Sequence, residues 1–132
     1  MNCRIGSLEV VLYKSVETLF TKKNKKVELC KSDIFESQKR VLLSSDTVQG
    51  HLHHKDITAF DYSLIPLMLK DDKHIFIQND TRYIIIKELG TYYHLALKNI
   101  KDKDEIFVVS LFNLGSKMNE KIRRLEKKYK KK

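Results

Sequence analysis

The chain contains 132 residues, of which 42% are hydrophobic, and it carries a formal net charge of +9. This length and composition suit one domain with one core, so we expect residues 1–132 to fold as a single unit. No apolar run is long enough to cross a bilayer and the first residues lack the apolar core of a signal peptide, so we expect a soluble, cytoplasmic protein. The two cysteines, Cys3 and Cys30, predict neither a disulfide framework nor a structural zinc site.

Most of the positive charge lies near the C-terminus. Residues 117–132 contain nine Lys or Arg and two Glu, and residues 22–26 contain a smaller group of four lysines. Basic clusters of this kind attract polyanions through the release of counterions, and nucleic acid is the usual ligand. An acidic protein partner, or a surface that serves only solubility, would give the same pattern.

The N-terminal third contains one clear helical pattern. Residues 7–21 place apolar side chains at intervals of three and four, which predicts an amphipathic helix after Ser7. The β-branched pair Val10 and Val11 leaves a strand as the alternative. Residues 27–30 are too few to assign, and the apolar run at residues 40–43 is interpreted as an edge strand or an extended lead into the next helix.

Two helix starts follow in residues 44–69. Ser45 is expected to cap the first helix, and Thr58 with Asp61 has the spacing of a capping box for the second. The second helix runs through an apolar segment that contains the only proline, Pro66. Because proline lacks an amide hydrogen, it should kink this helix or begin another short one.

Three of the five histidines, His51, His53 and His54, lie within four positions between these helix starts. If the first helix continues through residue 54, His51 and His54 share one face. Imidazole changes charge near neutral pH, so this pair could transfer protons, with Lys55 as a nearby cation. A solvated helix end that is rich in histidine is an equally good interpretation.

From residue 74 onward the sequence is typical of strands. Four segments are rich in β-branched and aromatic residues and are separated by short turns, at residues 75–77, 82–87, 92–98 and 106–112. Turns this short permit only antiparallel neighbours, so we expect a four-stranded meander with one face packed on the helices. Strict alternation in the last strand places Ser110 on the same face as its apolar neighbours Ile106 and Val108.

The chain ends in a basic helical segment, residues 116–132. Ser116 is expected to cap a helix whose apolar positions repeat at intervals of four and three, namely Met118, Ile122, Leu125 and Tyr129. This stripe predicts a docking face, and the last residues are expected to fray. The predicted fold class is therefore α+β, with N-terminal helices packed on a four-stranded antiparallel sheet and a basic C-terminal helix.

Short motifs follow one another in a distinctive order along residues 40–113. They are Val41-Leu42-Leu43-Ser44, Thr47-Val48-x-x-His51, His54-x-x-Ile57-Thr58-x-x-Asp61-Tyr62-x-x-Ile65-Pro66, Tyr92-Tyr93 leading to Lys98, and Ile106-Phe107-Val108-Val109-Ser110. In this order they resemble the phage-associated members of the barnase, EndoU, colicin and RelE-like (BECR) nuclease superfamily. The resemblance covers a little over half of the chain and implies a nuclease-like core of BECR fold at residues 40–113.

The resemblance implies that RNA is cut without a metal or other cofactor, through attack of the ribose 2′-hydroxyl on the neighbouring phosphate. Such a site needs a proton acceptor, a proton donor and cations where negative charge gathers. By position, His51 and His54 match the motif histidines, Lys98 the basic residue that contacts phosphate, and Ser110 the hydrogen-bond donor to a phosphate oxygen. The candidate substrate-binding residues are Lys55, Tyr62, Lys87, Tyr92 and Asn113.

The resemblance also implies a toxin or phage-associated effector that acts in the cytoplasm of its own or a target cell, with RNA and an acidic antitoxin or immunity protein as partners. Ordinary structural roles remain open for its site residues: Lys98 as an exposed strand residue, Ser110 bonded to backbone, and Tyr62 as an anchor for its helix. For the whole chain, two other functions remain open. One is a non-catalytic RNA-binding module, and the other is an interaction protein that uses its C-terminal helix.

Overall fold

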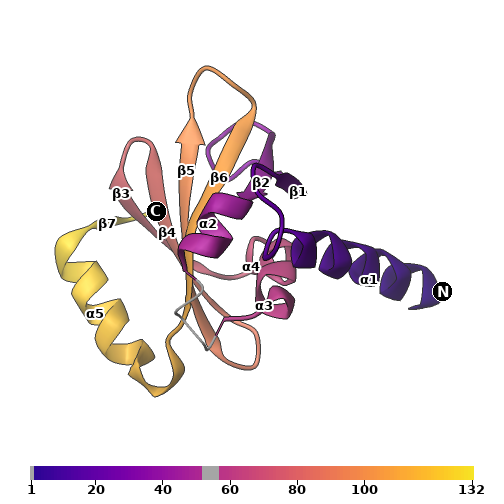
Figure 1. Ribbon diagram of the computed structural model, residues 1–132. Coiled ribbons are helices and arrows are strands. Elements are labelled where there is room, and N and C mark those ends of the chain that lie inside the picture. The colour runs from indigo at the N-terminus through magenta and orange to yellow at the C-terminus, as the bar shows by residue number, and fades with distance from the viewer. Residues whose placement is uncertain (1, 52–56) are drawn as a thin grey trace.

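The computed structural model describes the backbone of residues 2–51 and 57–132 and the side chains of residues 10–51, 57–115 and 117–132. Within these ranges the chain forms five α-helices and one seven-stranded sheet, in the spatial order β1-β2-β6-β5-β4-β3-β7 (Figure 1). The elements are α1 (Asn2–Thr18), β1 (Lys26–Ser32), β2 (Lys39–Ser44), α2 (Ser45–Gly50), α3 (Ala59–Ser63), α4 (Ile65–Met68), β3 (His74–Asn79), β4 (Arg82–Glu88), β5 (Tyr92–Ile100), β6 (Glu105–Asn113), a 3-10 turn (Gly115–Lys117), α5 (Met118–Lys128) and β7 (Lys130–Lys131).

Strands β3 to β6 form the predicted antiparallel meander, and the α+β class is confirmed. The expectation of a four-stranded sheet is wrong, because three more strands join it. β1 and β2 form a hairpin, and β2 also pairs in parallel with β6, so residues 40–43 lie inside the sheet and not at its edge. β7 pairs with the outer edge of β3, so the chain end is ordered. The pairing of β2 with β6 and of β7 with β3 joins strands that are distant in the sequence, and no local periodicity predicts it.

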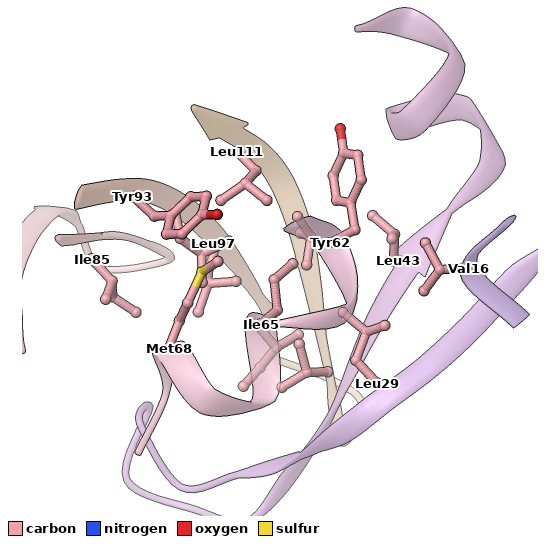
Figure 2. Close-up of a cluster of buried hydrophobic side chains, with 14 of the residues drawn as sticks. Val16, Leu29, Leu43, Tyr62, Ile65, Met68, Ile85, Tyr93, Leu97 and Leu111 are labelled. Carbon is pink, nitrogen blue, oxygen red and sulfur yellow. The ribbon is translucent and has the colours of Figure 1, made fainter. Parts of the chain in front are cut away.

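The two faces of the sheet pack against different helices. One face, which we call the core face, packs against α1, α3 and α4, and Figure 2 shows the side chains that meet there. The other, which we call the α5 face, carries Phe76, Ile84 and Ile86 of β3 and β4 under Leu125 of α5. Ten residues of the core-face cluster are labelled in Figure 2: Val16, Leu29, Leu43, Tyr62, Ile65, Met68, Ile85, Tyr93, Leu97 and Leu111.

The helix starts on either side of the histidine segment are fixed by side-chain caps. Ser44, and not the expected Ser45, caps α2: its Oγ accepts a hydrogen bond from the Thr47 amide at 3.1 Å. The capping box of Thr58 and Asp61 is confirmed at the start of α3. Pro66 lies in the first turn of the separate short helix α4, where its missing amide hydrogen costs no helical hydrogen bond.

A bulge in β6 changes the expected position of one candidate residue. Ala96 of β5 pairs with Ser110, and Leu97 pairs with Val108, so Val109 is an extra residue between two regular stretches. Cross-strand partners share a face, which puts Val108 on the core face with Leu97 and Ser110 on the α5 face with Ala96. Strict alternation, which had placed Ser110 beside Val108, is therefore wrong at this point.

The C-terminal helix uses its apolar stripe inside the molecule. Leu125 is buried against the α5 face, with Ile122 and Tyr129 packed around it. Ser116 does not occupy the N-cap position: α5 begins at Met118 after the 3-10 turn, with Lys117 at the N-cap and no side-chain capping bond. No helix in the described part of the chain combines the length and the apolar composition needed to cross a membrane.

Candidate functional site

The part of the α5 face formed by β5 and β6 carries three of the predicted site residues, Tyr92, Lys98 and Ser110. We call it the β5–β6 surface. Register pairs place these side chains together on it: Tyr92, His94, Ala96 and Lys98 from β5, and Phe107, Ser110 and Phe112 from β6. All of these except His94 remain at least partly exposed. The surface lies between α5, which covers β3 and β4, and α2, which contacts β6.

His51 is held at the α2 side of this surface. It is the C-cap residue of α2, its Nδ1 lies 2.8 Å from the Thr47 carbonyl, and its ring stands edge-on to Phe112 at 6.2 Å. Thr47 is itself fixed, because its Oγ1 donates to the Val108 carbonyl of β6. A carbonyl can only accept, so Nδ1 carries the hydrogen and Nε2 is the acceptor nitrogen of the neutral ring. That is the form a proton acceptor needs.

A second imidazole, His94 of β5, also packs against Phe112, and it was not among the predicted site residues. Its ring centroid is 5.6 Å from that of Phe112, its side chain is only 7% exposed, and its buried Nδ1 has no hydrogen-bond partner among the described residues. Burial, with Lys121 of α5 nearby, lowers the pKa of His94 from 6.5 to about 4. His94 is therefore neutral at pH 7.

This shift predicts a pH-dependent stability. Between pH 6.5 and 4 the unfolded chain binds a proton at His94 that the folded chain does not, so the free energy of unfolding should fall as the pH is lowered through this window. The contribution from pH 7 to pH 5 is about 2 kcal/mol. His94→Leu, compared with the unmodified protein by urea denaturation at both pH values, should remove that part of the decrease. An unchanged difference between pH 7 and pH 5 in the variant would contradict the assignment.

Ser110 and Lys98 lie at different positions along the β5–β6 surface. Ser110 lies opposite Ala96, near its middle, whereas the exposed Lys98 lies opposite Phe107, toward one end. Lys98 is four positions from His94 along β5, which corresponds to about 13 Å. A ligand that contacts both the His94 end and Lys98 must therefore extend along the strands.

Two cations that were not among the predicted site residues accompany Lys98, one of them from the basic group at residues 22–26. Arg82 of β4 is its direct cross-strand partner, and the Lys26 ammonium lies 5.7 Å from the centroid of the Phe107 ring. Like charges opposite each other destabilise a sheet, so this end of the surface is electrostatically suited to an anion. Only the pairing of β4 with β5 and the position of β1 could reveal this cluster.

Two predicted substrate-binding residues lie on the core face instead, and the prediction is wrong in their placement. Tyr62 is 2% exposed and packs edge-on against Phe20 at 6.1 Å, because its capping box turns the apolar side of α3 onto the sheet. Lys87 donates from Nζ to the carbonyls of Lys70 at 3.0 Å and Asp72 at 2.6 Å. Lys87 therefore supplies hydrogen-bond donors to the backbone carbonyls of the segment that follows α4.

The remaining predicted residues are Tyr92 and Asn113 at strand ends and two residues of the undescribed segment. Tyr92 begins β5 on the α5 face and packs against the Leu125 cluster. Asn113 ends β6, and its Oδ1 accepts hydrogen bonds from Thr91 Oγ1 at 2.9 Å and the Gly115 amide at 3.0 Å. His54 and Lys55 lie outside the described residues.

Neither a group of metal ligands among the described residues nor a similar known protein indicates a particular chemistry for this surface. Among the described residues no three His, Cys, Asp or Glu side chains are grouped so that they could hold a metal ion. No protein-family model, no curated protein and no solved structure matches this chain.

Proposed function

We propose that the chain is a metal-independent endoribonuclease whose substrate lies on the β5–β6 surface. The observation that carries the proposal is the placement of His51, Ser110 and Lys98 around one partly exposed sheet surface. A proton acceptor and a hydroxyl donor serve the attack of a 2′-hydroxyl on a phosphodiester, and a cation farther along the strand serves to hold the neighbouring backbone. The resemblance of residues 40–113 to BECR nucleases supports the same reaction.

Each residue then has a defined role. His51, with its hydrogen on Nδ1, accepts the 2′-hydroxyl proton at Nε2 as the oxygen attacks phosphorus. Ser110 donates a hydrogen bond to a non-bridging phosphate oxygen. The departing 5′-oxygen takes a proton from the second motif histidine, His54, and the products are a 2′,3′-cyclic phosphate and a free 5′-hydroxyl.

The strand side chains around these groups suit a single-stranded substrate. Phe112 and Phe107 are both half-buried on the β5–β6 surface, and aromatic rings bind bases by stacking with little dependence on sequence. Lys98 and Arg82 lie beside Phe107 and would hold the backbone of the neighbouring nucleotides. A single-stranded RNA of several nucleotides would thus span the distance between the His94 end of this surface and Lys98.

A biological role follows from the same proposal. A small, basic ribonuclease of this kind would act as a toxin or phage-associated effector in a cytoplasm, and an acidic antitoxin or immunity protein would neutralise it by covering the cations. The charge of +9 supports binding of either polyanion.

The test is a cleavage assay with the purified chain. Total RNA or tRNA incubated with it in EDTA should be cut, and the fragments should end in 2′,3′-cyclic phosphate. An oligonucleotide of the same sequence with 2′-O-methyl riboses should stay intact, because it has no nucleophile. Intact RNA after incubation with the unmodified protein would overturn the proposal.

A non-catalytic RNA-binding module is the second candidate, and the distance along β5 favours it. Because Lys98 is about 13 Å along the strand from His94, its ammonium and the histidine end need not meet at one phosphodiester. Such a module would bind RNA with the same steep dependence on salt and leave it uncut.

A further inference from the structure

A shallow depression lies between the end of β6 and α5, beside the β5–β6 surface. It has a volume of about 180 Å³ and is lined by Asn113, Leu114, Lys117, Glu120, Lys121 and Arg124. Three cations and one carboxylate give this lining a net positive charge. Among the described residues the ion pairs that the structure contains involve only Arg40 and Lys101, so the α5 cations are not neutralised by such pairs.

The orientation of α5 explains why these cations gather there. The apolar stripe that includes Leu125 points onto β3 and β4. Lys121 is close enough to His94 of β5 to affect its titration, whereas Glu126 similarly affects His74 of β3. One flank of α5 therefore faces β5 and the other faces β3. Lys117, Lys121 and Arg124 follow one another at intervals of four and three and so share the β5 flank.

Such a row of like charges is not needed to hold the helix in place. Cations four residues apart on a helix repel each other by roughly 0.2–0.5 kcal/mol per pair, and the apolar stripe already anchors α5. From residue 117 to residue 124 the row covers about 10 Å along the axis, enough for more than one backbone phosphate of a strand. The row also lies along the surface where the substrate is proposed to bind.

We propose that the β5 flank of α5, with Lys117, Lys121 and Arg124, binds the phosphodiester backbone of single-stranded RNA next to the cleavage site. This inference rests on the proposed function and adds a second binding site outside residues 40–113. Lysine and arginine side chains supply the positive charge for these backbone contacts.

The experiment compares two triple variants in binding an uncleavable 2′-O-methyl RNA oligonucleotide, measured by fluorescence anisotropy from 50 to 200 mM salt. The first is Lys117→Ala/Lys121→Ala/Arg124→Ala. The matched control, Arg123→Ala/Lys127→Ala/Lys130→Ala, removes three exposed charges from elsewhere on the same segment. Both keep the apolar stripe, and thermal melts by circular dichroism establish that both remain folded.

Loss of three phosphate contacts should reduce the steepness of the slope of log affinity against log salt concentration by about 2, because each contact to a single strand contributes about 0.7 to that slope. The advantage of the unmodified protein over the first variant should then shrink roughly 20-fold between 50 and 200 mM salt. The control variant should change the slope by much less. Equal slope changes in both variants would overturn the inference, because the effect would then be net charge and not this flank.

Two further results separate this inference from the proposed reaction. If the unmodified protein cuts RNA but the first variant binds the oligonucleotide normally, the flank inference is wrong and the ribonuclease stands. If the protein binds the oligonucleotide through this flank but leaves ordinary RNA intact, the inference holds and the ribonuclease is wrong. If poly-glutamate of matched charge displaces the oligonucleotide as well as unlabelled oligonucleotide does, the flank is a docking site for acidic protein and the inference is overturned.

Discussion

The double variant His51→Ala/His54→Ala is expected to cut RNA at least about 10²–10⁴-fold more slowly than the unmodified protein, because it lacks the groups assigned to proton transfer. His51 is fixed for that task by its contact with the Thr47 carbonyl and by the Phe112 ring. Cleavage is measured as the initial rate of release of fragments with cyclic phosphate ends. Binding of the 2′-O-methyl oligonucleotide should change little, which separates a lost reaction from a lost surface.

His74→Ala is the matched control for this variant. His74 begins β3, two strands away from β5, and its Nδ1 lies 2.7 Å from the Lys131 ammonium at the sheet edge. Its removal should leave the cleavage rate unchanged within a factor of a few. If the double variant cut RNA at the rate of the His74→Ala protein, the histidine segment would have no catalytic part.

Leu97→Ala should cause the largest loss of stability of the substitutions considered. Leu97 is fully buried at the centre of the sheet, where it lies beside Met68 of α4 on the core face (Figure 2). Truncating a buried leucine costs about 2–5 kcal/mol, through lost transfer energy and the cavity that remains. The free energy of unfolding of a domain of this kind is roughly 5–15 kcal/mol, so the truncation should remove a large share of it.

The measurement is urea denaturation, in which the midpoint should fall while the slope stays constant. Leu67→Ala is the control, because Leu67 on α4 is 41% exposed and its truncation should cost no more than about 0.5 kcal/mol. Equal midpoint shifts in the two variants would show that the sheet is not packed on the helices as described.

The candidate site could be predicted from the sequence only where its residues act through local structure. The caps of α2 and α3 follow from nearby side chains, which is why the histidine segment was expected between two helices. Ser110 was assigned to the wrong face, since the extra residue Val109 leaves no trace in the alternation of apolar residues. Arg82 and Lys26 reach the β5–β6 surface through pairing and packing across the sheet, which no local pattern encodes.

The sequence by itself determined the α+β class, the four meander strands, the capping box at Thr58 and the apolar stripe of α5, because each depends on side-chain spacing within one segment. Only the tertiary structure decided that β1, β2 and β7 extend the sheet. It also decided that Tyr62 and Lys87 lie on the core face, away from the β5–β6 surface, and that His94 lies on that surface. The physical reason is that β2 and β7 pair with β6 and β3, and that Tyr62, Lys87 and His94 are held by groups from other elements. Their placement therefore depends on the register of the whole sheet.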